Sequence, residues 1–198
     1  ALGSVLEHLR ENGYTLIGPR LDDGSITYDE IDGLEHLPVG WIDDQQAGSY
    51  RLEQQGNGRY FYYVVGANSW KRFLYPNGLE LFSTRKNENG FEVIAGSGDA
   101  SQYAFIGARS CDLAAIRIQD RIFIDSQIQD PHYRELREKA FILAVNCVKP
   151  GGTCFCVSMG TGPRCSDGYD LAITELQDVF VVGVGSPLGG HMLEGTGW

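Results

Sequence analysis

The sequence predicts a single mixed α+β domain, built from largely antiparallel strands, short helices and a cysteine-bearing loop region. Its 198 residues, of which 42% are hydrophobic, are enough to bury one substantial core. Many short segments are apolar or alternate between apolar and polar residues, as strands do, whereas helical spacing is confined to short stretches. All five cysteines lie in the second half of the chain, four of them between residues 147 and 165.

The N-terminal half is expected to hold one helix and then antiparallel strands. Residues 4–12 place Val5, Leu6 and Leu9 on one helical face after Ser4 as a cap, and a glycine ends the run. Alternation and turn residues then predict strands over 14–20 and 25–31, and a hairpin over 49–65 that turns at the sequence Gly-Asn-Gly.

The remaining elements follow from caps and from apolar runs. A short helix is expected within 67–75, capped by Asn68 or Ser69 and ended by Pro76. Two further helices are expected over 112–123, capped by Asp112, and over 130–140, where an Asp cap precedes a Pro. Apolar runs predict strands, buried in the first two cases, over residues 91–96, 103–108, 141–146, 170–176 and 179–185. The Gly-rich C-terminal residues are expected to be a tail or a connection.

The composition argues against a nucleic-acid partner and against a membrane span. The net charge is −10, with 16 Lys and Arg against 26 Asp and Glu, and no run of basic residues offers a phosphate backbone a site. We therefore expect no nucleic-acid partner. No apolar run approaches the ~20 residues that span a bilayer, and clustered cysteines are typical of thiolate sites in a reducing cytoplasm. We expect a cytoplasmic protein without a membrane span.

Four cysteines form the candidate site. Cys111 and Cys147 each follow a predicted strand, where loops gather in α/β units. Cys154 and Cys156 flank Phe155, and in an extended backbone two such thiols aim at one point while the residue between them points away. Four thiolates match an iron–sulfur cluster or a zinc site. A zinc site is disfavoured because the chain has no Cys-x2–4-Cys pair. Disulfides, a nucleophilic cysteine and buried structural cysteines remain alternatives to a metal site.

Residues around these cysteines are expected to support the site. Arg109 and Asp112 would orient the loop of Cys111, and Arg109 together with Arg164 would offset the charge of the thiolates. Phe155 and Met159 would exclude water. Glycines let the backbone turn its N–H groups toward sulfur, and those of this region are Gly151, Gly152, Gly160 and Gly162.

Several motifs resemble a known family. The strings GARSCDLAAIRIQDRIF, DPHYRELR, AVNC, CFCVSMGTGP and GYDLAITEL occur in that order within about residues 67–185. Together they resemble the N-terminal region shared by the iron–sulfur electron-transfer subunits of anaerobic sulfite reductase and of soluble NiFe sulfhydrogenases, in the latter the beta subunit. The resemblance implies a [4Fe–4S] cluster held by the family's cysteines, which correspond here to Cys111, Cys147, Cys154 and Cys156. Cys165 falls in no family motif and is expected to be a bystander.

The resemblance also implies a function and partners. We expect one iron–sulfur domain over residues 1–198, either alone or as the N-terminal part of a longer ferredoxin-containing subunit. It would relay single electrons from a flavin or ferredoxin-type donor to a hydrogenase or sulfite reductase type catalytic subunit, with catalytic and flavin-binding subunits as partners and no bond chemistry of its own. The alternative is a structural zinc module that positions partner subunits.

Overall fold

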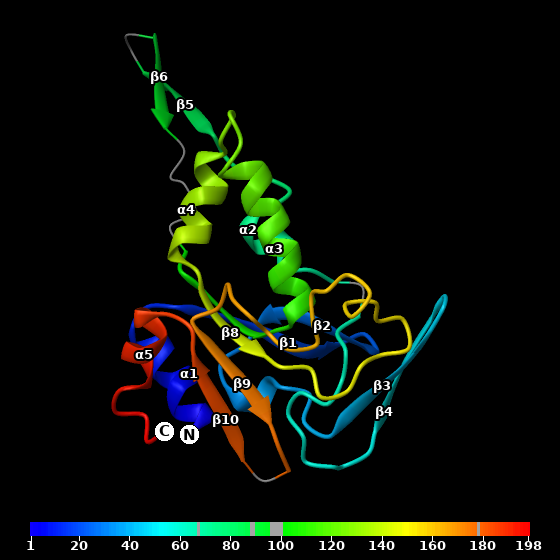
Figure 1. Cartoon of the computed structure of the whole chain (residues 1–198). Helices are drawn as coiled ribbons and strands as arrows, with labels where there is room; N and C mark the ends of the chain where they lie inside the picture. The colour runs from blue at the N-terminus through cyan, green and yellow to red at the C-terminus, as the bar shows by residue number, and fades with distance from the viewer. Residues whose placement is uncertain (67, 88–89, 96–100, 178) are drawn as a thin grey trace.

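The computed structural model describes residues 1–66, 68–87, 90–95, 101–177 and 179–198, and its centre is a six-stranded sheet of order β10-β9-β8-β7-β1-β2 (Figure 1). These strands are β1 (Thr15–Asp22), β2 (Ser25–Glu30), β7 (Tyr103–Ala108), β8 (Phe141–Val145), β9 (Leu171–Glu175) and β10 (Phe180–Val184). The expected α+β class is confirmed.

The middle of this sheet is parallel and only its edges are antiparallel. β1, β7, β8 and β9 run in the same direction, while β2 and β10 pair antiparallel at the two edges. Parallel neighbours need long crossovers. Two helices, α3 (Ser110–Phe123) and α4 (Pro131–Lys139), supply the crossover between β7 and β8. The largely antiparallel arrangement that the sequence predicts therefore describes the hairpins and edges, and not the centre.

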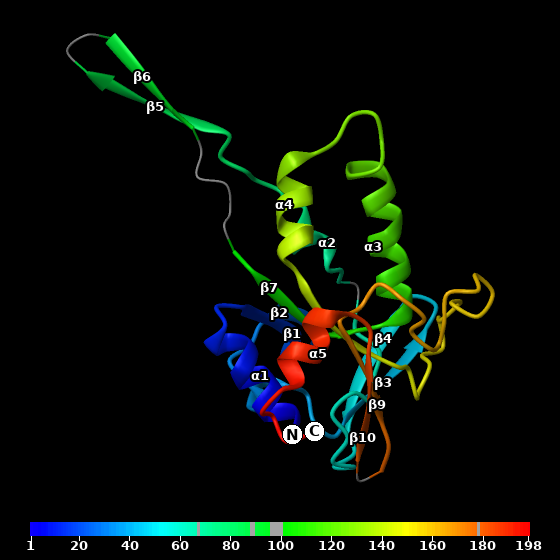
Figure 2. The same ribbon diagram turned by 60° about the vertical axis from the view of Figure 1, so that its left-hand side comes forward.

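Helices cover both faces of the sheet (Figures 1 and 2). On one face, α1 (Leu2–Glu11) and α5 (Pro187–Leu193) share a core cluster with alternate residues of β8, namely Phe141, Leu143 and Val145. On the other face, α3 and α4 share a second cluster with Ile142 and Ala144. Strands that are buried on both faces appear in the sequence as continuous apolar runs, which explains why β7 and β8 were predictable.

The hairpin predicted over 49–65 is wrong. The chain instead forms a hairpin from β3 (Trp41–Gln46) and β4 (Ser49–Gln54), which turns at Gly48 with a positive φ. The aromatic residues that follow are not in a strand, because Tyr60 and Phe61 donate their backbone N–H groups to the side chain of Glu175. A tertiary contact thus replaces the strand pairing that the alternation suggested.

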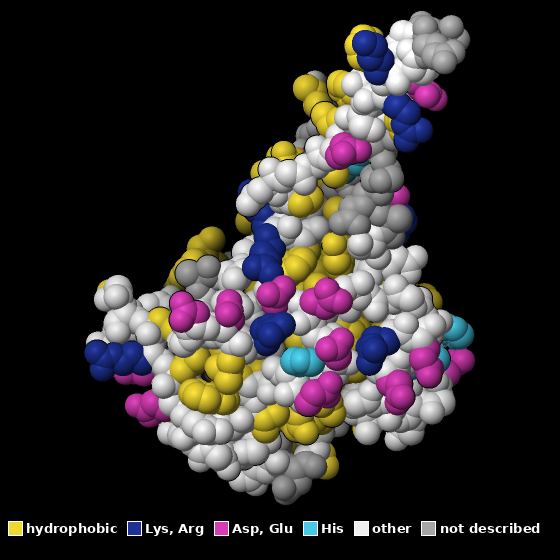
Figure 3. All heavy atoms as spheres, turned by 180° about the vertical axis from the view of Figure 1, so that it is seen from behind, with side chains coloured by type: hydrophobic (Ala, Val, Ile, Leu, Met, Phe, Trp, Pro, Cys, Tyr) yellow, Lys and Arg dark blue, Asp and Glu magenta, His cyan; other side chains and the backbone are white. Residues whose placement is uncertain are grey.

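A second hairpin projects from the body (Figure 2). It pairs β5 (Phe82–Asn87) with β6 (Gly90–Ala95). The sequence predicts a buried strand at 91–96, and that burial is wrong for Phe91 and Val93, which are 75% and 68% exposed; residue 96 lies outside the described residues. Figure 3 shows hydrophobic and basic side chains together on the surface of this projection.

Most other elements lie near their expected positions, but α1 begins at Leu2, so the expected cap Ser4 lies inside the helix and does not cap it. α2 (Lys71–Leu74) is a single turn, and a 3-10 turn, η1 (Leu34–His36), follows β2. Asp130 caps α4 by accepting the backbone N–H groups of His132 and Tyr133, as predicted. The C-terminal residues expected to be a tail form α5, which Ser186 caps. Within the described ranges, no helix is long and apolar enough to cross a membrane.

Candidate metal centre

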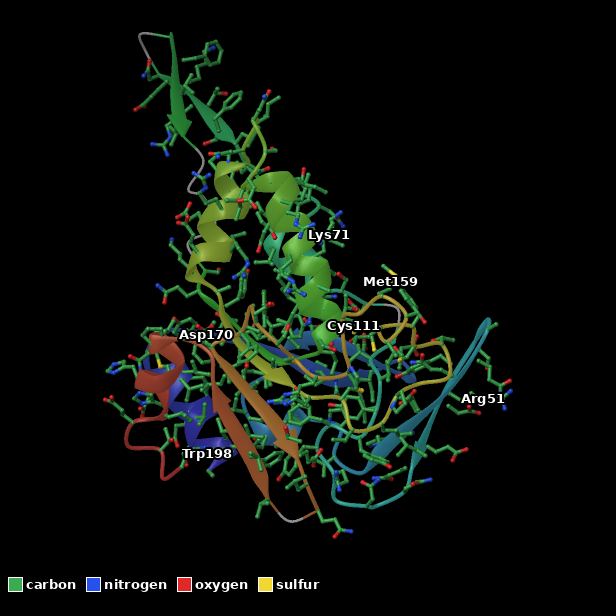
Figure 4. The ribbon with its side chains drawn as sticks, viewed as in Figure 1. Arg51, Lys71, Cys111, Met159, Asp170 and Trp198 are labelled. Carbon is green, nitrogen blue, oxygen red and sulfur yellow. The ribbon has the colours of Figure 1, made fainter. Side chains whose placement is uncertain are left out.

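The structure brings the cysteine-bearing segments to one edge of the sheet. β7 and β8 are parallel neighbours, so their carboxyl ends meet at the same edge. Cys111 follows β7 in the first turn of α3, and Cys147 follows β8. The other three cysteines lie in the loop that leaves β8 and returns to β9. Figure 4 shows Cys111 at the foot of α3, on the side where Met159 and its loop lie.

The start of α3 is fixed by a side chain that lies inside the helix. Asp112 accepts a hydrogen bond from the backbone N–H of Arg109 at 2.8 Å and another from the hydroxyl of Tyr28 at 3.1 Å. A carboxylate in the first turn also counters the helix dipole. α3 therefore begins at Ser110, two residues before the expected cap, and this places Cys111 within the first turn. Burial raises the pKa of Asp112, and its hydrogen bonds oppose that rise.

The loop after β8 packs directly against the start of α3. A Cβ on Gly162 would collide with Ser110 Oγ and would lie 3.1 Å from Cys156 Sγ, so only glycine permits this approach. The backbone N–H of Cys147 donates to the carbonyl of Pro163 at 3.1 Å, which ties the two ends of the loop together. The Cys156 thiol consequently lies beside the residue that precedes Cys111.

The thiols influence one another electrostatically. Although Cys111 reaches the surface, burial of its thiol raises the pKa to about 12, and the charges of Asp112 and Cys156 add to the rise. Burial also raises the pKa of Cys147, to which Cys154 and Cys156 contribute. Several thiolates in this neighbourhood would be costly without a cation, and that is the compensation a metal centre supplies.

One backbone N–H of this glycine-rich segment donates to a cysteine sulfur, as expected for Gly151. The N–H of Gly151 donates to Cys154 Sγ at 3.3 Å. Contacts of this kind stabilise thiolate ligands and affect the potential of an iron–sulfur centre. Gly160 has a φ of +64°, a conformation that glycine adopts without strain, so it serves the turn rather than the sulfur atoms.

The side chains expected to exclude water lie on the surface. Phe155 is 70% exposed and Met159 is 64% exposed, and Arg164 is also exposed. Within this chain neither apolar side chain covers the thiols, so their shielding role stays a prediction that requires a covering surface.

Cys165 differs from the other cysteines in its surroundings. It is buried in the core cluster beneath α3, and its backbone N–H donates to Asn146 Oδ1 at 2.8 Å. Burial raises the pKa of its thiol to about 11. Among the residues that the structure describes, no group of three or more His, Cys, Asp or Glu side chains is placed to hold a metal ion, and the assignment of ligands therefore stays a prediction.

Two buried acids that sequence reasoning missed organise the segment beside the site. Glu175 accepts the N–H groups of Tyr60 and Phe61 at 2.7 and 2.9 Å, and Asp43 accepts that of Val64 at 2.7 Å. In the sequence Glu175 is an ordinary polar position of a predicted strand, and Asp43 lies where no element is predicted, so no local signal marks either residue. Through these bonds the acids hold the segment 60–64 in place.

The same segment binds Arg109. The Nη2 of this arginine donates to the carbonyl oxygens of Phe61 and Tyr63 at 2.8 and 3.0 Å. Its guanidinium lies close enough to the thiols of Cys111 and Cys147 to lower the pKa of each, against the effect of burial. A buried positive charge thus accompanies the gathered cysteines, which is an arrangement that suits an anionic thiolate centre.

Comparison with known proteins gives one similarity. The chain is similar to the protein named sulfhydrogenase 2 subunit beta from Pyrococcus furiosus, with 37% identity over 119 residues. The aligned part is 60% of this chain and 33% of that protein, so the chain spans about a third of the relative's length. No protein-family model and no solved structure matches the chain. The similarity supports the hydrogenase beta subunit side of the resemblance; the link to anaerobic sulfite reductase stays a prediction.

Proposed function

We propose that this chain is an iron–sulfur electron-transfer domain of a hydrogenase-type complex. The observation that carries the proposal is the convergence of cysteines from separate segments at one sheet edge, beside a buried arginine. The similarity to a protein named as a sulfhydrogenase subunit supports the same class of function. The proposed domain covers residues 1–198, alone or as part of a longer subunit.

The proposed ligands are Cys111, Cys147, Cys154 and Cys156, and the proposed group is a [4Fe–4S] cluster. Such a cluster accepts and returns one electron at a time. The residues of the chain fit it in three respects: the thiols share one neighbourhood, a backbone N–H already donates to Cys154 Sγ, and the charge of Arg109 opposes that of the thiolates. The chain would bind, orient and tune the cluster while taking no part in bond chemistry.

The proposed partners are those of a redox complex. A flavin or ferredoxin-type donor would supply electrons, and a catalytic subunit of hydrogenase type, or of sulfite reductase type, would receive them. The exposed Phe155 and Met159 beside the cysteines give a partner an apolar surface close to the centre. A cytoplasmic location fits the five cysteines, none of which is in a disulfide.

Anaerobic purification of the chain, with iron and sulfide analysis, tests the proposal. We expect a brown protein with close to four iron and four sulfide per chain, bleached by dithionite, with an electron paramagnetic resonance signal in the reduced form. Cys111→Ser is expected to lose the cluster, whereas Cys165→Ser, the matched control, keeps it. A colourless protein with stoichiometric zinc would show that the structural zinc module is correct. Loss of iron in Cys165→Ser would show that the ligand set is wrong.

A further inference from the structure

Arg109 carries a buried charge whose hydrogen-bond donors are only partly used. Its side chain belongs to a residue that is only 6% exposed, at the junction between β7 and α3. Nη2 binds the carbonyl oxygens of Phe61 and Tyr63, but Nε and Nη1 are buried and have no hydrogen-bond partner within the described part of the chain. Such donors are costly to bury, so their retention indicates that another group uses them.

Among the described residues, no carboxylate forms an ion pair with this charge. Asp112 is near enough for Arg109 to lower its pKa, but its carboxylate binds the backbone N–H of Arg109 and the hydroxyl of Tyr28 instead of the guanidinium. A buried guanidinium that lacks an ion pair is rare, because burial of an unpaired charge is unfavourable.

The fold places this arginine beside the cysteines. Arg109 stands two residues before Cys111, and Ser110 between them lies so close to Gly162 that a Cβ there would collide with Ser110 Oγ and would lie 3.1 Å from Cys156 Sγ. Arg109 also follows β7, whose parallel neighbour β8 ends just before Cys147. The lowering of the pKa of Cys111 and Cys147 by Arg109 agrees with this placement, in which thiolates and the group they bind would supply the missing compensation.

We propose that Arg109 sets the reduction potential of the iron–sulfur centre by stabilising its reduced state. This inference rests on the proposed function. When the donor supplies one electron, the centre gains one negative charge and no bond in the chain forms or breaks. A fixed positive charge that is itself buried favours that additional negative charge, so it raises the potential.

A purely structural role is the competing explanation. Through Nη2, Arg109 also ties the segment 61–63 to the start of α3. A structural role predicts that a variant loses stability but, where the cluster is retained, keeps the potential of the unmodified chain. The proposal predicts a change in potential even in a variant that is fully folded.

Potentiometric titration of the purified chain, monitored by electron paramagnetic resonance, separates the two. Arg109→Gln removes the charge, and we expect a potential lower by at least about 59 mV, which is a tenfold change in the ratio of reduced to oxidised centre for a one-electron couple. Arg109→Lys retains the charge, and its shift is expected to be less than half as large. Circular dichroism and iron content establish that each variant is folded and loaded.

Arg59→Gln is the matched control. Arg59 also carries a largely buried positive charge and binds Glu175 at the same segment, with Nη2 3.0 Å from the backbone oxygen. It is not among the groups that affect the pKa of any thiol given above. We expect this control to lower stability while the potential stays within about 20 mV, a twofold change in that ratio, of the unmodified chain.

The proposal is overturned if loaded Arg109→Gln keeps the potential of the unmodified chain, or if Arg59→Gln shifts the potential equally. Should Arg109→Gln fail to fold, replacement of Arg109 by citrulline decides, because citrulline keeps the planar shape of arginine and its Nε–H and one NH2 group but carries no charge. An unchanged potential in the citrulline protein also overturns the proposal. If the unmodified chain binds no iron, the proposed function fails instead, and that result is distinct from all of these.

Discussion

Replacement of Glu175 by glutamine is expected to reduce the stability of the fold substantially. Glu175 is 3% exposed, and its two carboxylate oxygens each accept one backbone N–H, from Tyr60 and from Phe61. Arg59 Nε lies 3.6 Å from Oε1. The amide of glutamine keeps one acceptor oxygen but presents an NH2 group where the second acceptor stood, so one buried N–H loses its partner and faces another donor.

The magnitude follows from these contacts. A hydrogen bond to a charged group contributes about 1.5–3 kcal/mol, and an unsatisfied buried donor costs about 1–3 kcal/mol. Breaking a buried ion pair costs about 3–5 kcal/mol, a range that includes part of the same loss. Since these contributions overlap, we expect a decrease of about 3–5 kcal/mol in the free energy of unfolding. That is a large share of the ~5–15 kcal/mol that stabilises a typical domain.

Urea denaturation followed by circular dichroism measures this change, with the midpoint and the slope compared between variants. Glu53→Gln is the matched control, because Glu53 is also in a strand but is exposed. We expect the control to change the free energy of unfolding by no more than about 0.5 kcal/mol. A change below about 1 kcal/mol for Glu175→Gln would refute the reasoning that this carboxylate anchors the segment 60–64.

Three further predictions concern the loop, the hairpin and the thiols. Gly162→Ala would force a Cβ into Ser110 and Cys156. We therefore expect the free energy of unfolding, measured by heat or urea, to fall by about 1–3 kcal/mol and the iron content to be lower. Gly78→Ala is the control, because its Cβ would meet nothing, and it should keep both the stability and the iron content. Phe91→Ser in the projecting hairpin is expected to change the free energy of unfolding by less than about 0.5 kcal/mol, because its ring is exposed. Phe105→Ala in the core should lower the free energy of unfolding by about 3–5 kcal/mol. Equal losses for the two variants in urea unfolding would contradict the fold. In metal-free protein, alkylation of Cys111 measured by mass spectrometry should still accelerate between about pH 10 and the raised pKa of about 12, instead of levelling above the usual value of 9.0. Because the Cys111 thiol holds its proton more tightly in the folded state, the stability it contributes is present below about pH 9 and is lost as the pH rises toward 12. An alkylation rate that is constant above about pH 10 would show that the thiol is not buried.

Elements with local signals were predictable from the sequence. The Asp cap and the Pro at the start of α4, and the apolar runs of β7 and β8, are contained within a few consecutive residues. The ends of those runs also predict that Cys111 and Cys147 each follow a strand. That the two strands end at the same edge depends on their parallel pairing, which the sequence did not predict.

Features that depend on distant residues were not predictable. The hairpin expected over 49–65 failed because Glu175, 115 and 114 positions beyond Tyr60 and Phe61, takes the N–H groups that a strand partner would have used. The burial of Arg109 depends on carbonyl groups 46 and 48 positions earlier in the chain. From its sequence neighbourhood, this arginine is simply a polar residue before a helix.

These contacts link the fold to the proposed centre. Asp43 and Glu175 hold the segment 60–64, and this segment supplies the two carbonyl acceptors of Arg109. The guanidinium of Arg109 lies close enough to the Cys147 thiol to lower its pKa. The cysteines are set by the segment 147–156 and by the ends of β7 and β8, whereas the charge of Arg109 is held in place by the distant segment 60–64 and by the acids that bind it. A peptide that contains the loop alone would therefore retain thiolates for a metal but would lack the group that sets the potential. For this reason the cysteine motif can indicate that a centre is present, while its reduction potential depends on the whole domain.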